Sequence, residues 1–237
     1  MPNKLARLAD DLREVPSYTI REAAFYLDIP FATLRSWVLG RTYPRIEGQG
    51  VFKPVITIPQ SAPRLLSFTN LVEAHVLDAI RRKHRVPLPA VRKAIEYLQS
   101  KFPSRHPLAD QSFETDGADL FVEKFKQVIN ISRDGQLAMR ELLQSHLRRI
   151  DRDTNGLPLK LYPFTRRHQP DDPKVVVIDP RISFGRPVLA GTGIATAVIA
   201  ERLKAGETID QLAEDYGRQA HEIEEAIRYE LQFRTAA

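Results

Sequence analysis

Apolar residues recur at helical spacing through most of the first hundred positions of this chain. Thr19 is a good N-cap and Glu22 follows it at capping-box spacing, which predicts a helix over about 19–27. Residues 28–30, Asp-Ile-Pro, break this helix, and a second helix is expected over 31–39, ended by a glycine. The pattern therefore predicts two short helices joined by a tight turn.

The following residues first have the pattern of a small hairpin and then return to helical spacing. β-prone residues flank Gly48-Gln49-Gly50, so a turn is expected there. Ser67 or Thr69 is expected to begin a longer helix, and another helix follows the interruption by Val-Pro-Leu-Pro at 86–89. Prolines and polar residues then predict the end of a first domain, residues 1–105.

The middle segment, residues 106–173, has weaker periodicity. Strands are expected at 128–132 and 157–164, and one helix face is expected to carry Leu143, Leu147 and Ile150. The stretch 166–174 is polar and contains prolines, so it is interpreted as the linker into the last module. The middle segment is thus predicted to be α+β.

The last module, residues 174–237, is expected to open with a hairpin over 175–194 and to continue with three helices. Two apolar stripes support the second and third helices: Ile209, Leu212, Ala213 and Tyr216, then Ile223, Ala226, Ile227 and Leu231. The predicted fold class is mainly α with small β-hairpins. It combines an N-terminal winged helix-turn-helix with a C-terminal hairpin and three-helix, helix-turn-helix-like module.

Charge separates the two ends of the chain. The net charge is +5. Residues 1–105 hold 17 Lys+Arg against 9 Asp+Glu, a net of +8, whereas residues 175–237 hold 7 against 10, a net of −3. This distribution is typical of a protein in which one module of several meets phosphate, and it assigns that role to the N-terminal domain.

Several classes of chemistry are not expected. The chain has no cysteine, which rules out disulfides, thiolate metal sites and cysteine nucleophiles. The six histidines fall in different predicted elements without metal-ligand spacing, and surface positions are expected for them. Gly185, Gly191 and Gly193 lack P-loop spacing and are interpreted as hairpin turns. We therefore expect no catalytic residue, metal or cofactor, and no enzymatic activity.

The first seventeen residues mix charged and apolar side chains without a continuous apolar run. Such a segment forms neither a signal peptide nor a spanning helix. A cytoplasmic location without membrane contact is the expectation.

The first helix pair has the residues that a DNA-binding helix-turn-helix requires. Ala24 suits the helix crossing, Ile29 suits the turn, and two apolar anchors, Leu34 and Trp37, stand beneath the second helix. The outer face then carries three candidate DNA-binding residues: Thr33, Arg35 and Ser36. The alternative is a plain helical hairpin whose arginine is only solvated.

These residues and the following hairpin and basic helix pair resemble the winged DNA-binding domain of the MerR regulators over about 18–100. The resemblance implies that basic residues of the second helix and the wing contact the DNA backbone: Arg35, Arg41, Arg45 and Lys53. No long dimerisation helix with effector cysteines follows, so the metal-sensing role of that family does not carry over.

Residues 174–231 are similar to the domain of unknown function 433, whose mark is a D-P-x-I…G-x-P-V-x-x-G-T-R-I hairpin before three helices. The matching residues are Asp179, Pro180, Ile182, Gly185, Pro187, Val188, Gly191, Thr192 and Ile194. Gly193 stands where that family usually has arginine. Members are commonly antitoxins, and the combination with a winged helix resembles VapB-type antitoxins. That resemblance implies a PIN-domain ribonuclease as partner.

The first functional hypothesis is an antitoxin of a type II toxin-antitoxin pair. A homodimer is expected to repress its own operon by binding double-stranded DNA at a two-fold operator, while the remainder inhibits the toxin. The last helix carries acidic residues that phosphate would repel, so protein contact is expected there, with the toxin or a second copy, unless the face is simply solvated: Glu222, Glu224, Glu225 and Glu230.

PIN nucleases bind a divalent metal with a group of carboxylates, and the guanidinium of a partner can compete with the metal for them. Three arginines of this chain are candidates for such inhibition: Arg166, Arg167 and Arg234. One alternative function is a stand-alone MerR-like regulator whose C-terminal module dimerises or senses a ligand. Another is an interaction protein without a DNA role, which predicts no salt-sensitive binding to duplex DNA.

Overall fold

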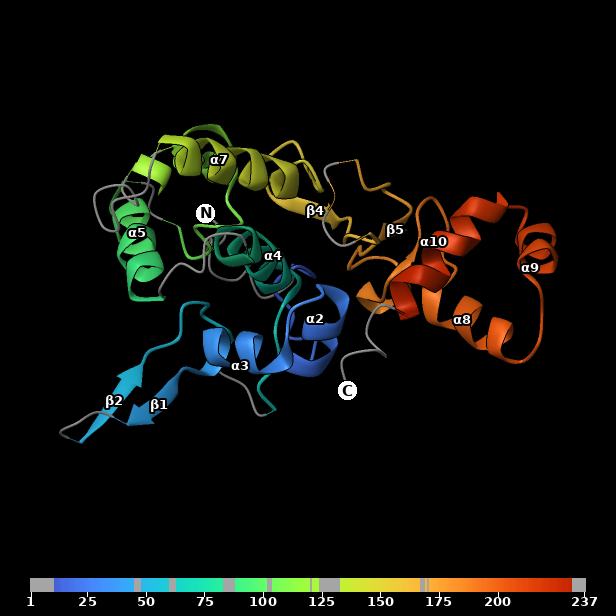
Figure 1. Cartoon of the computed structure of the whole chain (residues 1–237), viewed down its shortest axis with the longest axis horizontal. Helices are drawn as coiled ribbons and strands as arrows, with labels where there is room; N and C mark the ends of the chain where they lie inside the picture. Colours follow the sequence, from blue (N-terminus) through green and yellow to red (C-terminus); the bar gives the residue numbers. More distant parts are fainter. Residues whose placement is uncertain are drawn as a thin grey trace, which may run out of the picture.

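The helix-turn-helix forms at the predicted positions in the computed structural model (Figure 1). The structure describes residues 11–44, 48–59, 63–82, 88–101, 104–119, 121–123, 133–166, 169 and 171–231. Helix α2 spans Ile20–Tyr26, and the Thr19 hydroxyl accepts a hydrogen bond from the Glu22 backbone N–H at 3.1 Å. The Glu22 carboxylate in turn accepts from the Thr19 N–H at 2.9 Å, so the predicted capping box is confirmed. Helix α3 follows over Phe31–Leu39.

A two-stranded antiparallel wing follows α3. Strand β1 spans Arg41–Pro44 and strand β2 spans Gln49–Phe52. The predicted hairpin is confirmed, but its turn was placed too late: Gln49 pairs with Pro44 and Gly50 pairs with Tyr43. Of the three residues expected to form the turn, only Gly48 stands outside the strands, and its φ of +80° is a left-handed conformation that favours glycine.

Two longer helices complete the N-terminal part, α4 over Phe68–Arg82 and α5 over Leu88–Lys101. Ser67 caps α4, because its hydroxyl accepts from the Asn70 N–H at 3.2 Å. Nearly the whole circumference of α4 up to residue 80 is buried rather than one stripe, because other elements surround it. Helix α4 is thus the central element of the fold.

The middle segment packs on α4 through helix α7, Arg133–Leu147 (Figure 1). Strands β3, Ile150–Arg152, and β4, Pro158–Leu161, form an antiparallel pair, and a π-helical turn spans Phe113–Gly117. The expected strand at 157–164 is confirmed in its first half, whereas the one at 128–132 lies outside the described residues. Ile150 was assigned to a helix face but begins β3, since α7 ends three residues earlier.

The C-terminal module has the predicted hairpin and three helices. Strands β5, Val176–Val177, and β6, Val188–Leu189, pair antiparallel. The helices that follow are α8 over Thr196–Lys204, α9 over Ile209–Tyr216 and α10 over Ala220–Leu231. Leu231 was expected on the buried stripe of the last helix, but it is 43% exposed because it ends that helix.

Two clusters of buried apolar residues hold the chain together. The first extends from Tyr18 to Ile178 and includes α2, α3, α4, α5 and α7, and the second includes Leu189, Ile199, Leu212 and Ile223 of the C-terminal module. The division into 1–105, 106–173 and 174–237 stays a prediction, and it does not coincide with separate cores. No helix in the described part of the chain is long and apolar enough to cross a membrane.

The C-terminal module contacts α2 directly. The hydroxyl of Tyr229, on α10, donates to the carbonyl oxygen of Tyr26 at 3.0 Å, and the Tyr229 ring lies edge-on to Phe25 with centroids 6.4 Å apart. This contact fixes the C-terminal module against the helix-turn-helix, as the blue and orange-red elements of Figure 1 show.

Candidate DNA interface

Helix α3 presents one basic side chain outward. Leu34 and Trp37 are buried as predicted, Arg35 is exposed, and Thr33 is half-buried. The Ser36 hydroxyl donates to the Thr33 carbonyl at 2.7 Å, so it remains available to solvent partners only as an acceptor. Of the three residues expected to read DNA, Arg35 is therefore the one whose side chain can fork onto a base edge or a phosphate.

The start of α3 adds an aromatic side chain that the sequence interpretation left out. Phe31 is 45% exposed, and the guanidinium of Arg21, from α2, lies 5.3 Å from the centre of its ring. A cation over an aromatic face is held in place while its edges stay open to an anion. Arg21 thereby joins Arg35 as a basic group of the helix-turn-helix.

The wing places two of the predicted basic residues on the surface. Arg41 is exposed and its guanidinium lies 5.1 Å from the ring centre of Phe52, while Lys53 is exposed directly after β2. The backbone after the wing binds to α3, since the N–H groups of Val55 and Ile56 donate to the Trp37 carbonyl at 2.7 and 3.1 Å. These bonds fix the wing relative to α3. Arg45 lies outside the described residues.

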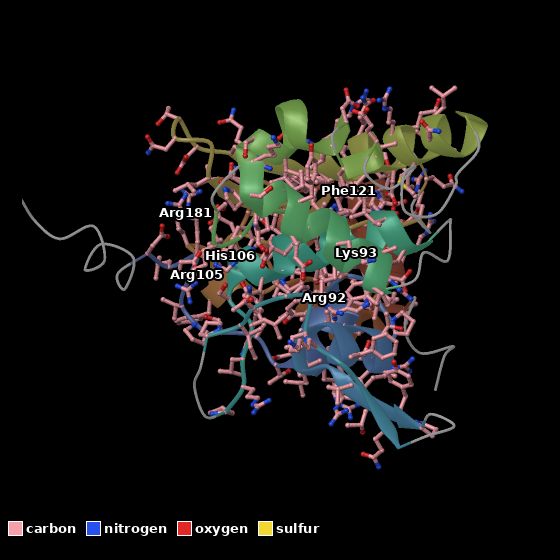
Figure 2. The ribbon with its side chains drawn as sticks, turned by 90° about the vertical axis from the view of Figure 1, so that its left-hand side faces the viewer. Arg92, Lys93, Arg105, His106, Phe121 and Arg181 are labelled. Atoms are coloured by element: carbon pink, nitrogen blue, oxygen red, sulfur yellow. The ribbon has the colours of Figure 1, made fainter. Side chains whose placement is uncertain are left out.

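Helix α5 supports the wing through Arg92, which lies where α5 meets the N-terminal helices (Figure 2). The Arg92 guanidinium donates to the backbone carbonyl of Lys53, and the next residue, Lys93, is exposed. At the same end of the wing, where Arg41 pairs with Phe52, burial and the neighbouring Arg41 guanidinium lower the pKa of Arg81. The sequence showed a basic helix pair but not which of its residues reach the wing. The described interface therefore combines α2, α3, the wing and α5.

Gly40 connects α3 to the wing in a backbone conformation that other residues adopt at a cost. Its φ is +72°, and a Cβ there would collide with the Phe52 carbonyl oxygen. We expect Gly40→Ala to lower stability by about 1–3 kcal/mol and to weaken DNA binding, because the wing must shift. Gly48→Ala is the matched control: its φ is +80°, but a Cβ there meets nothing within 4 Å. Thermal unfolding and duplex binding by both variants test this; equal binding by both would show that the close approach does not set the wing.

The candidate toxin-contacting arginines have a different status. Arg166 already forms an ion pair, its Nε and Nη2 atoms donating to one carboxylate oxygen of Glu225 at 2.8 and 2.6 Å. Its segment is not a free linker: the Asp172 carboxylate accepts from the backbone N–H groups of Thr165 and Arg166 at 2.9 and 2.7 Å. Arg167 and Arg234 lie outside the described residues.

The glutamates of α10 do not form one solvated acidic face. Glu225 is only 2% exposed; burial raises its pKa, but hydrogen bonds from Arg166 and Thr165 outweigh this and lower it. The carboxylate of Glu222 pairs with Arg218, and that of Glu230 accepts from the Thr196 hydroxyl at 2.6 Å. Glu224 is the exposed one of the four. Most of these charges serve contacts within the chain.

The histidines also differ from expectation. His75 and His146 are buried, with ring centroids 4.8 Å apart, and His106 lies between two carboxylates. The prediction of surface positions is wrong for His75 and His146, because other elements cover α4 and α7, which carry them. His106 follows α5 in a bend and is half-buried between its two carboxylates. Among the described residues, no group of three or more acidic or histidine side chains is arranged to hold a metal ion.

Known protein families match both the N-terminal helix-turn-helix and the C-terminal module of this chain. A family model described as "Putative DNA-binding HTH domain" matches residues 16–95, and one described as "Protein of unknown function (DUF433)" matches residues 176–229. A protein of Mycobacterium tuberculosis named "Putative antitoxin VapB45" is 32% identical over 90% of this chain and 93% of its own length. The chain belongs to the VapB45 family.

Two further proteins match this chain over a similar share of its length. "Uncharacterized protein Rv2308" of M. tuberculosis is 26% identical over 94% of this chain and 93% of its length. The crystal structure of Rv2018 from M. tuberculosis has a TM-score of 0.65 and 28% identity, covering 90% of this chain and 98% of that one. The two family models thus match the chain on either side of its middle segment, and these relatives match it over 90–94% of its length. No enzyme family is among these matches.

Proposed function

We propose that this chain is a cytoplasmic antitoxin that binds its own operator as a homodimer and inhibits a PIN-domain ribonuclease. The observation that carries the proposal is the basic surface of Arg35, Arg41 and Lys53 in a chain that matches an antitoxin over 90% of its length. The N-terminal surface has the charge for phosphate contact, whereas residues 175–237 have a net charge of −3, which disfavours it. A division of labour between DNA and toxin follows from this difference.

Co-expression with a PIN-domain ribonuclease gene from the same operon tests the proposal. We expect the two proteins to copurify, the complex to leave RNA intact, and the complex to bind the promoter of that operon. A stand-alone regulator, the alternative function, predicts promoter binding without copurification. If the purified chain neither copurifies with the nuclease nor binds the promoter, both functions are excluded.

Arg35 decides how the proposed interface reads DNA. If its guanidinium forks onto guanine, we expect Arg35→Ala to weaken operator binding by about 1–3 kcal/mol and to relax preference at one base pair. If it grips phosphate, the loss is equal on operator and random duplex, and the salt slope falls by about one per contact. Binding isotherms at several salt concentrations on both duplexes separate the two cases.

The matched variants for this test are Lys53→Ala and Glu224→Ala. Lys53, in the wing, is expected to behave as a phosphate contact, whereas Glu224, exposed on α10, is expected to leave DNA affinity unchanged. Both variants are made in the full chain, since the first core joins the N-terminal and middle segments. Unchanged binding by Arg35→Ala on both duplexes would place the DNA site elsewhere.

A further inference from the structure

A groove lies between the N-terminal segment and the C-terminal module. Leu12 and Val15 line it from the chain before α2, Tyr26 from α2, and Pro180 and Phe184 from the loop between β5 and β6. Its volume is about 280 Å³. This is below the usual size of a small-molecule site, and it suits one or two side chains of a protein partner.

Phe184 is presented to solvent in an unusual way. Its side chain is 92% exposed, the most exposed large apolar side chain in the described part of the chain. Ser183 and Phe184 have φ values of +48° and +58°, which non-glycine residues rarely adopt. The loop therefore holds an aromatic side chain in water at a cost in backbone energy. Such strain is typical of sites where a partner is bound.

The base of the groove contains a polar group without a partner. Tyr18 is buried to 3% exposure, and its hydroxyl has no hydrogen-bond partner among the described residues. Gly185 lies so close that a Cβ there would collide with this hydroxyl. Buried hydroxyls are almost always hydrogen-bonded in folded proteins. A segment bound in the groove can supply the missing partner after a small shift of the loop.

Arg186 gives the Phe184 side of the groove a positive charge. Arg186 is exposed beside Phe184, and no ion pair involves it within the described residues. Arg181 is already paired with Asp179. Glu22 also lines the groove and keeps its negative charge, because the groups that its carboxylate accepts from, the N–H and hydroxyl of Thr19, are neutral. The part of the groove that a carboxylate can pair is therefore the part around Arg186. A partner with a carboxylate next to an apolar side chain complements this surface, because it pairs Arg186 and covers Phe184.

We propose that this groove, with Phe184 and Arg186 at its rim, is where the toxin docks. The occupant is a surface segment of the nuclease that carries an apolar side chain for the groove and a carboxylate for Arg186. This inference rests on the proposed function, because it needs a toxin partner, and it assigns toxin contact to the groove rather than to Arg166. On binding, the toxin covers Phe184, which then becomes the kind of buried aromatic anchor that dominates such interfaces.

Inhibition of RNA cleavage by the full-length variants tests the proposal. With the copurifying nuclease, Mg²⁺ and an RNA substrate, Phe184→Ala is expected to raise the half-inhibiting concentration about thirtyfold or more. Arg186→Glu is expected to raise it about tenfold or more, and Arg186→Lys much less. Val198→Ala is the matched control, since Val198 is 49% exposed on α8 of the same module but does not line the groove.

Each outcome has one meaning. Loss of inhibition by Phe184→Ala and Arg186→Glu, with operator binding and melting temperature unchanged, supports the proposal. If the parent inhibits the nuclease and both variants inhibit it equally well, the docking site is wrong while the proposed function stands. If Phe184→Ala instead changes a dimer into a monomer in solution, the groove holds a second copy and the toxin assignment fails. If the parent does not inhibit, the proposed function itself fails.

Discussion

Arg149→Met is expected to destabilise the protein by about 4 kcal/mol. The Arg149 side chain is buried, and its guanidinium stacks 4.4 Å from the ring centre of Phe164. It donates to four backbone carbonyls at 2.6–3.1 Å, those of Tyr162, Pro163, Asp172 and Pro173. Each buried carbonyl that loses its donor costs about 1–3 kcal/mol, and losses in one network do not add fully.

Urea unfolding measures this loss, with Arg148→Met as the matched control because Arg148 is the exposed neighbour. Arg149→Lys is expected to restore little of the stability, since an ammonium group cannot reproduce the planar fork that reaches four acceptors. A cost below about 1 kcal/mol for Arg149→Met would mean that water replaces the guanidinium at these carbonyls.

The role of Arg149 shows what the sequence could and could not predict. Local signals were sufficient for the helices: the capping box at Thr19 and the Asp-Ile-Pro break at 28–30 act within a few residues, and both formed as predicted. The stretch 166–174 was interpreted as a linker because its composition is polar. Within it, Arg149 binds the backbone carbonyls of Asp172 and Pro173, which lie 23 and 24 positions further along the chain, and no local pattern encodes such a contact.

The candidate DNA site also contains residues that the sequence predicted and residues that it did not. Arg35 could be placed on the outer face of α3 because helical periodicity fixes which residues are buried. Arg92 was missed because its contact with Lys53 depends on how α5 packs against the wing. The two residues are 39 positions apart in the sequence, so no local pattern relates them. Charge alone marked both helices after the wing as basic. Tertiary packing then decides which basic side chains support the interface and which face solvent.

Buried charges were the least predictable class. His106 was predicted to lie at the surface and Glu73 was not singled out, since a lone polar residue is usually solvated. Glu225 was predicted to contact a protein partner. The structure buries each beside a partner from a distant segment: Glu73 beside His106, and Glu225 beside Arg166. These pairs hold together elements that no local signal relates.

His106, which is labelled in Figure 2, binds side chains from two other segments of the chain. Its Nδ1 lies 2.9 Å from the carboxylate of Glu73 on α4, and its Nε2 lies 3.1 Å from that of Glu14 before α2. Burial opposes the charge of His106, but its hydrogen bonds to Glu14 and Glu73 prevail and raise its pKa to about 9. Burial raises the pKa of Glu73, whereas hydrogen bonds from His106 and Thr69 lower that of Glu14.

These pKa shifts predict a loss of stability at alkaline pH. The pKa of His106 rises from 6.5 to about 9 on folding, so the folded state holds a proton that the unfolded state has lost. This contribution, about 3 kcal/mol, is complete below pH 6.5 and disappears as pH rises through about 9. The raised pKa of Glu73 acts in the same direction at lower pH, because protonation favours its buried state.

His106→Ala is expected to cost about 3–5 kcal/mol at pH 6, because it leaves the Glu73 carboxylate buried without its cation. Denaturant unfolding from pH 5 to 10 checks this: the parent should lose stability between about pH 6.5 and 9, whereas the variant should show little further loss there. Adding Glu73→Gln to His106→Ala should recover part of the stability, since a neutral amide still accepts from Asn70, whose Nδ2 lies 3.2 Å from the carboxylate. If the parent and His106→Ala lose stability in parallel over this range, the pH dependence does not come from the deprotonation of His106.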